Sequence, residues 1–316
     1  MNRSADEIVV QAEALTKRFA AVVAVSRVSF SVRRGEVFGL VGPDGAGKTT
    51  VMRMLAGVMK PEEGTTIIEG VDVAARPEDI RRRVSYMPQR FALYEDLTVD
   101  ENIRFYADVF EIAPKLREER AARLLAASGM GHFRARLAGQ LSGGMKQKLG
   151  LTCALIHTPR VLLLDEPTTG VDPVSRRDFW RILYSLREEG VTIVISTAYL
   201  DEAERCNRLA LLHRGELRYV DTPDNLRKLL PGQVVAVTSG EPGRAQQTLV
   251  GMPGVSAVRV LGDGVRALVD DQLRRIPEIE RALKAGGVSF GGVAASRTSV
   301  EDVFVGLLQN DLAPKQ

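Results

Sequence analysis

One stretch of the chain decides the fold: Gly42-Pro43-Asp44-Gly45-Ala46-Gly47-Lys48-Thr49. It fits the pattern G-x-x-x-x-G-K-[ST]. It follows an apolar run that predicts a strand, Val37–Val41, and precedes a run that predicts a helix, Thr50–Gly57. A strand, a glycine-rich loop and a helix in this order form a phosphate-binding loop. The glycines let the backbone curl so that its N–H groups converge on phosphate oxygens, and the helix presents its N-terminus to the same anion.

Two side chains of this loop carry specific chemistry. Lys48 places a positive charge between the β- and γ-phosphates of a nucleotide, and Thr49 offers its hydroxyl to Mg²⁺. Asp44 is an acid beside a phosphate cradle, so we expect its side chain to point away from the anion. The residues of this region predicted to bind nucleotide are Gly42, Asp44, Gly45, Ala46, Gly47, Lys48, Thr49 and Thr50.

A second motif is an apolar run that ends in two acids, Val161-Leu162-Leu163-Leu164-Asp165-Glu166. A strand that is apolar on both faces fits the middle of a sheet covered on both sides. At the C-terminal end of such a strand, Asp165 can reach Mg²⁺ directly or through water. Glu166 then lies where an attacking water would sit and can act as a general base. Alone, this pattern is weak evidence for a nucleotide site, but downstream of a phosphate loop it is strong evidence.

A third motif lies between the other two and reads Leu141-Ser142-Gly143-Gly144-Met145-Lys146-Gln147. Ser142 and the amides of Gly143 and Gly144 form a second anion site at the start of a helix. Here the sequence resembles the ATPase domains of ABC transporters, whose hallmark reads L-S-G-G-Q and opens a helix. The resemblance covers roughly residues 8 to 225. It implies ATP and Mg²⁺ as cofactors and a P-loop fold with a parallel-sheet core, an antiparallel β subdomain and a helical subdomain.

The resemblance also assigns roles to residues outside these motifs. Phe19 matches the aromatic that stacks on adenine. Gln89 matches the glutamine that contacts Mg²⁺ and water and senses the membrane partner. Asp172 matches the acid that acts across a dimer interface. The resemblance therefore implies Mg²⁺ ligands at Thr49, Gln89 and Asp165, and catalytic roles for Lys48, Gln89 and Glu166.

The resemblance further implies two kinds of partner. In this family two ATP molecules are held between two ATPase domains, arranged head to tail as a homodimer or a heterodimer. The hallmark of one domain grips the γ-phosphate bound by the other. A membrane-spanning permease is the second partner, and we expect it to touch the surface near Gln89–Asn102, with Phe91-Ala92-Leu93-Tyr94 as apolar anchors. The alternative interpretation of those anchors is the buried start of a helix.

Three further stretches resemble the drug-export, or ABC-2-type, subfamily: residues 94–102, residues 199–204 and the closing Ser299-Val300-Glu301-Asp302-Val303-Phe304. Permeases of that subfamily are separate six-helix subunits. The resemblance implies export of a small, hydrophobic or drug-like substrate, and a peripheral position on the cytoplasmic face of a bacterial inner membrane. The substrate class is an analogy at the level of the fold, because none of these residues is expected to touch a substrate.

The chain departs from the family at Ser196-Thr197-Ala198, where the family has histidine after Ser-Thr. That histidine hydrogen-bonds the γ-phosphate and holds the attacking water, and alanine can do neither. Losing one such transition-state contact commonly costs about 10²–10³ in rate. We therefore expect a site that binds ATP well and hydrolyses it slowly, as in the first ATPase half of tandem exporter ATPases. A displaced histidine is the alternative, with His213 the nearest downstream, and Met145 is a second departure.

Composition limits the other functions that the chain can have. It has 316 residues, 26% of them charged, and a formal net charge of +3 with both signs mixed along the chain. Nucleic-acid binders concentrate Lys and Arg far more strongly, so we expect no nucleic-acid partner. The two cysteines, Cys153 and Cys206, have no metal-ligand spacing and fit a reducing compartment. No run approaches the roughly 18 apolar residues that span a bilayer, and Met1–Glu7 has no signal-peptide core.

Two rival functions are compatible with a phosphate loop. A soluble ABC protein that acts on ribosomes or DNA would carry two ATPase domains, long insertions or basic arms, and the sequence shows none of these. The second rival is a nucleotide-binding regulator that does not hydrolyse ATP. Ala198 is compatible with this function, whereas Glu166 argues against it.

The chain is predicted to contain an ATPase domain over residues 8–230 and an accessory domain over residues 232–311. In the first, further strands are predicted at Val22–Val32, Val191–Ser196, Leu209–Leu212 and Leu217–Val220. The second follows a βαββαβ order, typical of a small α+β ferredoxin-like fold. Its predicted elements are Val234–Thr238, Arg244–Val250, Val255–Leu261, Val265–Val269, Ile276–Ala285, Val288–Phe290 and a last helix, Ser299–Gln309.

Overall fold

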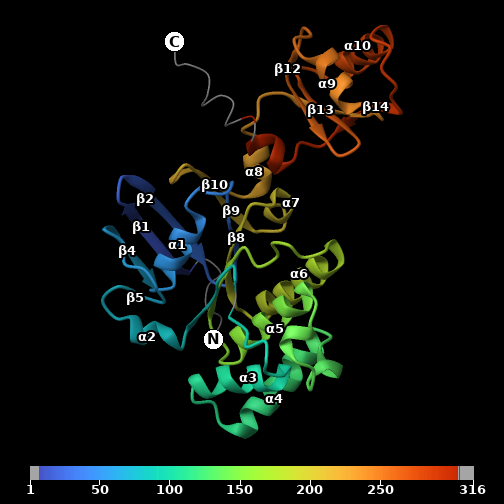
Figure 1. The fold of residues 1–316 in the computed structure, drawn as a ribbon. Coiled ribbons are helices and arrows are strands. Elements are labelled where there is room, and N and C mark those ends of the chain that lie inside the picture. The colour runs from blue at the N-terminus through green and yellow to red at the C-terminus, as the bar shows by residue number, and fades with distance from the viewer. Residues whose placement is uncertain (1–6, 91, 305, 307–316) are drawn as a thin grey trace. The chain divides into compact units, whose positions relative to one another are not determined.

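A computed structural model gives the fold and describes residues 7–90, 92–304 and 306. The chain divides into two compact units, Met1–Thr222 and Pro223–Gln316, which Figure 1 draws from blue to yellow and from yellow to red. Each unit has its own sheets and is described by itself below.

A six-stranded sheet forms the centre of the first unit, in the order β10-β9-β3-β8-β7-β6. All neighbours pair in parallel except β9 and β10, which form an antiparallel hairpin through Arg214 and Gly215. The central strands are buried along their whole length, because helices cover both faces. The strands are β3 (Val37–Val41), β6 (Val84–Met87), β7 (Val161–Asp165), β8 (Thr192–Thr197), β9 (Arg208–His213) and β10 (Glu216–Asp221).

A smaller antiparallel sheet, in the order β2-β1-β4-β5, belongs to the same unit. Its strands are β1 (Ile8–Phe19), β2 (Val22–Arg33), β4 (Glu63–Ile68) and β5 (Val71–Asp72). The long β1–β2 hairpin places Phe19 at its tip. The antiparallel strand predicted at residues 22–32 is therefore present as β2.

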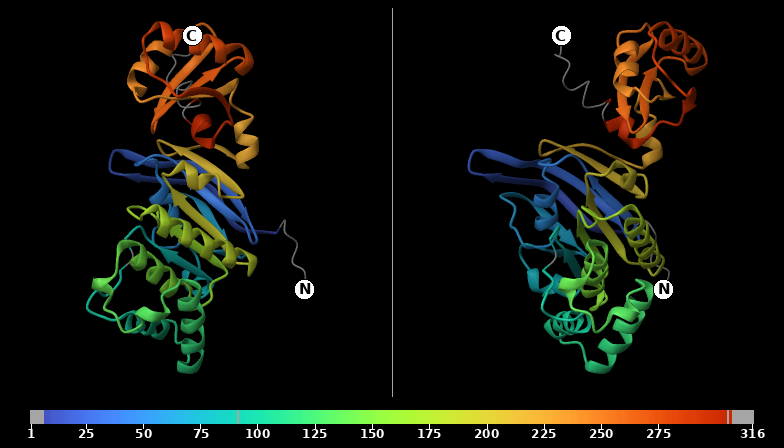
Figure 2. Two further views of the ribbon diagram at one scale, coloured as in Figure 1. Left: turned by 90° about the vertical axis from the view of Figure 1, so that its right-hand side faces the viewer. Right: turned by 45° about the vertical axis from the view of Figure 1, so that its right-hand side comes forward.

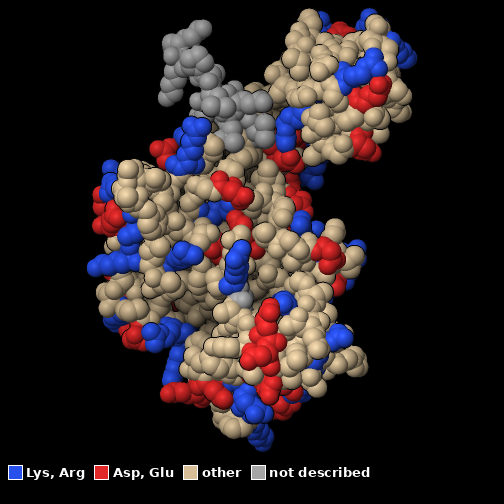
Figure 3. Space-filling model, viewed as in Figure 1, with Lys and Arg blue, Asp and Glu red and all other residues tan. Residues whose placement is uncertain are grey.

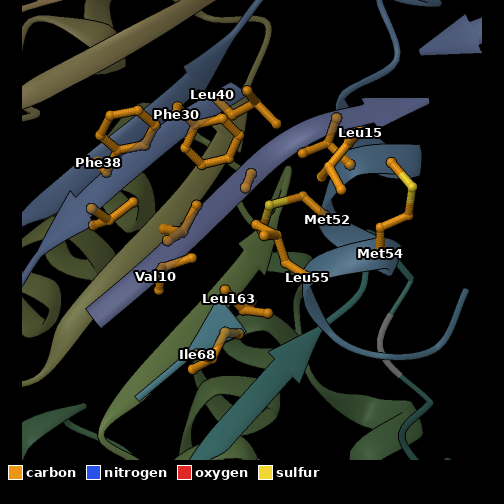
Figure 4. Packing of buried hydrophobic residues seen from close by; sticks show 14 of the residues in the cluster. Val10, Leu15, Phe30, Phe38, Leu40, Met52, Met54, Leu55, Ile68 and Leu163 are labelled. Atoms are coloured by element: carbon orange, nitrogen blue, oxygen red, sulfur yellow. The ribbon is translucent and has the colours of Figure 1, made fainter. Parts of the chain in front are cut away.

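The hydrophobic core of this unit joins the two sheets through α1 (Lys48–Leu55), which packs against strands of both. Figure 4 shows Met52 and Leu55 of α1 close to Val10, Leu15 and Leu163. The rings of Phe30 and Phe38 stack with centroids 5.2 Å apart. This core fixes the first turn of α1, which carries the phosphate loop, against the end of β7.

Helices between β6 and β7 form the helical part of the unit, drawn in green in Figure 2 to one side of the strands. They are α3 (Val99–Val109), α4 (Pro114–Ala127), the short 3₁₀ helices η1 (Gly131–Phe133) and η2 (Ala138–Gln140), and α5 (Gly143–Leu155). A capping box opens α3, since the Thr98 hydroxyl accepts from the Glu101 amide at 3.2 Å and Glu101 accepts from the Thr98 amide at 2.8 Å. The remaining helices are α2 (Pro77–Arg81), α6 (Pro173–Glu188) and α7 (Leu200–Ala203).

The second unit begins with α8 (Pro223–Arg227) and contains a four-stranded antiparallel sheet in the order β12-β13-β11-β14. With two helices packed on one face, this is the ferredoxin-like arrangement predicted from the sequence. The other elements are β11 (Gln233–Thr238), α9 (Pro242–Leu249), β12 (Val255–Leu261), β13 (Gly264–Val269), α10 (Gln272–Ala285) and β14 (Gly292–Ser296).

The last strand of this unit lies further along the chain than predicted. The prediction of Val288–Phe290 is wrong, because the strand β14 starts at Gly292. The amide of Val288 donates to the carbonyl of Leu283 at 3.0 Å, so the end of α10 uses the backbone group that a ladder would need. The Val288 side chain packs into the core instead.

The last predicted helix, Ser299–Gln309, is described only in part. Residues 300–304 are helical, and the Ser299 hydroxyl accepts from the Asp302 amide at 3.2 Å, as expected of an N-cap. Residues 307–309 lie outside the described part of the chain. Within the described ranges, no helix has both the length and the apolar character needed to cross a membrane.

Candidate functional site

A cavity of about 590 Å³ opens at the C-terminal ends of the parallel strands of the first unit. Open α/β sheets bind ligands at this edge. Segments that are far apart in sequence supply its walls. The lining residues are Phe19, Ala24, Asp44, Gly45, Gly47, Lys48, Thr49, Thr50, Gln89, Glu166, Thr169, Ala198 and Tyr199.

The phosphate loop connects β3 to α1, as the sequence predicted. Gly47 caps the helix with φ of 100°, a conformation that L-residues other than glycine rarely adopt. A Cβ at this position would lie 2.5 Å from the carbonyl oxygen of Ala24. Gly42 and Ala46 are buried behind the cavity surface, while Asp44 is exposed and belongs to the cavity lining.

Lys48 is buried and reaches three oxygen acceptors. Its Nζ donates to the carbonyls of Gly42 and Pro43 at 2.8 and 3.0 Å. It also forms an ion pair with Glu166 Oε1 at 2.9 Å, and the two side chains are 3% and 10% exposed. A buried ammonium needs such acceptors. A phosphate group that reaches Lys48 would take the place of the carboxylate.

Asp165 is fully buried at the end of β7, and hydroxyl groups from three elements surround it. Its Oδ1 accepts from Ser196 at 2.6 Å and from Thr49 at 3.2 Å. Its Oδ2 accepts from the hydroxyl of Tyr86 at 3.2 Å. The carboxylate therefore has one orientation, beside the hydroxyl of the phosphate loop.

Glu166 stands at the cavity surface in a strained backbone conformation. Its φ is 48°, a value that is uncommon for a residue with a side chain and that clusters at functional sites. Its amide donates to the carbonyl and the hydroxyl of Ser196 at 3.1 and 3.0 Å. Its Oε2 accepts from Gln89 Nε2 at 2.9 Å. Gln89 and Glu166, which are distant in sequence, thus meet directly.

These residues fit a magnesium ion that is shared with phosphate. Mg²⁺ prefers hard oxygen ligands, and one or two carboxylates with phosphate oxygens and water usually suffice. The Asp165 carboxylate and the Thr49 hydroxyl lie side by side, and the Gln89 amide carries a further oxygen. Among the residues that the structure describes, no group of three or more His, Cys, Asp or Glu could hold a metal by itself.

Ala198 lies in the cavity wall and is exposed. None of the three histidines, all of them within the described residues, belongs to the lining. His213 ends β9, and His157 is buried with its ring stacked on Phe110 at 3.8 Å. The displaced histidine that the sequence left open is therefore not found at this cavity.

A buried carboxylate holds the backbone around Ala198. Glu202 is fully buried, and it accepts from Thr197 Oγ1 at 2.8 Å, Thr168 Oγ1 at 2.6 Å and Trp180 Nε1 at 3.2 Å. It therefore ties the end of β8 to α6 and to the turn after Glu166. The motifs of the sequence predicted no role for Glu202 or Tyr86 at this site. Glu202 is one of several charged residues between Asp201 and Arg205, so nothing in the local sequence distinguishes it.

Several predicted residues lie outside the cavity. Ser142 caps α5 by accepting from the Met145 amide at 3.3 Å, and Gly143 and Gly144 form the first turn of that helix. Asp172 caps α6 by accepting from the amides of Val174 and Ser175 at 3.0 and 2.9 Å. Hydrogen bonds from Ser175 hold the pKa of Asp172 below its ordinary value.

Phe19 offers an aromatic surface at the cavity edge. Its side chain is 46% exposed at the tip of the β1–β2 hairpin. The ammonium of Lys17 lies 5.9 Å from the ring centroid. An exposed ring beside a phosphate loop is placed where a base could stack on it.

Comparison with known proteins identifies the relatives of this chain. The family model described as ABC transporter matches residues 25–169. The chain is 42% identical over 307 residues to the "Probable multidrug ABC transporter ATP-binding protein YbhF" of Escherichia coli K12, which covers 96% of this chain. The chain spans only 52% of that relative. It is 34% identical over 313 residues to the "Daunorubicin resistance ATP-binding protein DrrA2" of Streptomyces coeruleorubidus, with 96% of this chain and 95% of that protein covered.

Solved structures of similar fold are also ATP-binding parts of ABC transporters. A structure titled "Structure of ATP binding subunit of ABC transporter" superposes with a TM-score of 0.64 at 32% identity, covering 70% of this chain and 92% of that chain. "Dimeric Structure of MJ0796, a Bacterial ABC Transporter Cassette" superposes with a TM-score of 0.62 at 27% identity, covering 67% and 98%.

Proposed function

Because the chain belongs to the family of ABC transporter ATP-binding proteins, we propose that it is the ATP-driven motor subunit of a drug exporter. The observation that carries this proposal is the single cavity that brings Lys48, Thr49, Gln89 and Glu166 together, with Asp165 directly beside Thr49. These residues come from separate segments, and only the fold joins them.

Each residue has a distinct task in the proposed reaction. Lys48 binds the β- and γ-phosphates and balances their charge, and Thr49, Asp165 and Gln89 hold Mg²⁺. When bound, Mg²⁺ neutralises charge on the phosphate oxygens. Glu166 takes a proton from the attacking water. Phe19 stacks on the adenine, and the backbone of residues 42–50 cradles the phosphates.

We propose that this site hydrolyses ATP slowly. Ala198 offers no donor to the γ-phosphate and no acceptor for the attacking water, and no histidine replaces it within the described cavity lining. Removing one such transition-state contact commonly costs about 10²–10³ in rate. Binding depends on Lys48 and the phosphate loop, which Ala198 leaves untouched. The intact position of Glu166 favours slow turnover over none.

The residues of the hallmark motif act on a second ATPase domain. Ser142, Gly143 and Gly144 lie outside the cavity of their own chain, which suits a role toward the nucleotide of a partner. Asp172 is exposed at the start of α6, whose first turn lies against the first turn of α5. The partner is another copy of this chain or a related domain with a more active site, and a relative in the solved structures is described as dimeric.

We propose that the motor drives a separate ABC-2-type permease for small, hydrophobic or drug-like substrates. Relatives named for multidrug transport and daunorubicin resistance support this substrate class. The expected permease contact is the surface of residues 89–102, where Tyr94 is 44% exposed and Phe91 lies outside the described residues. The protein then works peripherally, at the cytoplasmic face of a bacterial inner membrane.

Binding of ATP by two lysine variants tests the proposed site. Lys48→Ala removes the buried cation of the cavity and is expected to weaken ATP affinity at least about ten-fold, the effect of losing one charged hydrogen bond. Lys60→Ala, an exposed lysine outside the cavity, is the matched control and should change affinity less than about two-fold. Equal affinities in both variants would contradict the proposed site.

ATP-driven pairing tests the motor itself. In Glu166→Gln the general base is lost while shape and ATP binding are kept, so saturating ATP should convert the purified chain to a dimer in light scattering. Lys48→Ala in the same background should stay monomeric. A chain that binds ATP tightly and never pairs, with itself or with a second ATPase domain, would contradict the motor.

A further inference from the structure

Tyr86 is an aromatic side chain that reaches the buried acid of the site. It lies in β6, the edge strand that pairs with β7, and its hydroxyl is 3.2 Å from Asp165 Oδ2. The contact therefore joins the edge strand to the acid at the end of its neighbour β7.

The chemistry of the two groups fixes the direction of this bond. A carboxylate can only accept, so the Tyr86 hydroxyl donates to Asp165. Burial, together with the negative charge of Asp165, raises the pKa of Tyr86 to about 12.

The two oxygens of Asp165 are held by different partners. Thr49 and Ser196 both donate to Oδ1, while Tyr86 donates to Oδ2. Two bonds to one oxygen leave the carboxylate free to turn about them, and a bond to the other oxygen stops that rotation. Groups that orient a metal ligand in this way commonly set metal affinity.

We propose that Tyr86 is a positioning residue that orients Asp165 for Mg²⁺. This inference rests on the proposed function, in which Asp165 helps to hold that ion. Tyr86 itself touches neither nucleotide nor metal in this scheme. It acts through the carboxylate to which its hydroxyl donates.

The surroundings of Tyr86 supply a matched control. Its ring packs against the core and lines a second cavity, of about 410 Å³, beside α1, α2 and α3. Tyr106 lines the same cavity, and its hydroxyl donates to the carbonyl of Ala92 at 2.6 Å. The pKa of Tyr106 is also raised to about 12, chiefly by burial. The two tyrosines share a cavity and a half-buried setting, but they differ in the acceptor of the hydroxyl proton, which is Asp165 for Tyr86 and a backbone carbonyl for Tyr106.

The test compares Tyr86→Phe with Tyr106→Phe in the full chain. Each variant loses one oxygen and keeps the ring. Binding of a fluorescent ATP analogue is measured first in EDTA and then while MgCl₂ is added. For Tyr86→Phe we expect affinity in EDTA within about two-fold of the unaltered chain. The Mg²⁺ concentration that produces half of the change in analogue binding should rise about 10-fold, the usual effect of removing a residue that hydrogen-bonds a metal ligand. Tyr106→Phe should change neither quantity.

Three outcomes would overturn the inference. If Tyr86→Phe needs no more Mg²⁺ than the unaltered chain, Tyr86 does not orient Asp165. If its affinity falls equally in EDTA and in Mg²⁺, Tyr86 serves only the packing of the site. If the unaltered chain shows no Mg²⁺ dependence at all, the proposed magnesium site itself is wrong, a failure distinguishable from the first two.

Discussion

The carboxylate of Glu202 illustrates how single side chains hold this site in shape. It is fully buried and accepts hydrogen bonds from Thr168, Trp180 and Thr197. Thr197 precedes Ala198, and Thr168 follows Glu166 by two positions. A buried carboxylate is stable only when it is hydrogen-bonded in this way, and the donors around it depend on it equally.

We predict that Glu202→Ala lowers the free energy of unfolding of the first unit by about 3 kcal/mol or more. The substitution leaves three buried donors without an acceptor, each costing about 1–3 kcal/mol before relaxation. Urea unfolding followed by the fluorescence of Trp180, the only tryptophan, measures this loss. Asp201→Ala is the control, because the Asp201 side chain is 62% exposed and should matter by less than about 0.5 kcal/mol. Equal losses in both would refute the role of Glu202.

At this scale, the sequence predicted the residues that belong to a motif and missed those that do not. Lys48, Thr49 and Glu166 were predicted because the phosphate loop and the acidic strand end constrain their residue types, and the structure brings them into one cavity. Tyr86 and Glu202 act through contacts 79 and 34 positions away in sequence. No local pattern encodes such contacts, since they depend on which strands become neighbours.

Among the elements, the starts of α5 and α6 form a tight junction. Gly144, in the first turn of α5, faces Ser175 in the first turn of α6. A Cβ on Gly144 would lie 2.5 Å from both Cβ and Oγ of Ser175. A Cβ on the neighbouring Gly143 would meet nothing closer than 4.0 Å, the carbonyl oxygen of Gly170. The packing of the two helices therefore requires glycine at position 144 but not at position 143.

We predict opposite effects for alanine at these two positions. Gly144→Ala should lower the free energy of unfolding by about 1–3 kcal/mol, because overpacking forces the two helices apart. Gly143→Ala should be neutral or stabilise by up to about 1 kcal/mol, because alanine favours the helix. Urea unfolding of both variants measures the difference.

A rescue variant makes this prediction specific to the junction. Ser175→Gly removes both atoms that the new Cβ would strike, so Gly144→Ala combined with Ser175→Gly should recover most of the loss. Strictly additive losses in the double variant would show that the helices do not meet as described.

Elements were predicted well where hydrophobic pattern and turn residues agreed. The strand β3 and the strand β12 have the predicted bounds. The strands predicted at Leu209–Leu212 and Leu217–Val220 are present as β9 and β10, and the turn between them uses Arg214 and Gly215, both with positive φ. The last strand was predicted too early, at Val288–Phe290, because the apolar Val288 suggested a strand. Val288 is apolar because it packs into the core beneath the end of α10. The strand β6 was not predicted, because four residues with a serine and a tyrosine among them carry little strand signal.

The whole molecule combines a nucleotide-binding unit with a second compact unit that has a core of its own. On the face shown in Figure 3, basic and acidic side chains are interspersed, in line with the net charge of +3. The described residues on this face form no basic stripe of the kind that nucleic-acid binders carry. The fold class followed from the sequence because the motifs of the family fix the order of strands and helices around them.

The central claim at this scale is that the chain binds ATP well and turns it over slowly. Ala198 is exposed in the cavity wall, so a longer side chain has room there, and Glu202 already holds the backbone beside it. If the missing histidine limits the rate, a histidine at position 198 should raise ATP turnover without changing the affinity for ATP. Ala126→His, at an exposed position of α4 away from the cavity, controls for the added imidazole.

The decisive measurement is ATP turnover by the purified chain beside Ala198→His, with ATP affinity measured for both. We predict equal affinities and a rate for Ala198→His at least about ten-fold higher, approaching the roughly 10²–10³ typical of one transition-state contact. Ala126→His should leave both quantities unchanged. An unaltered chain that already turns over several ATP per second, with no gain from Ala198→His, would contradict slow turnover at this site.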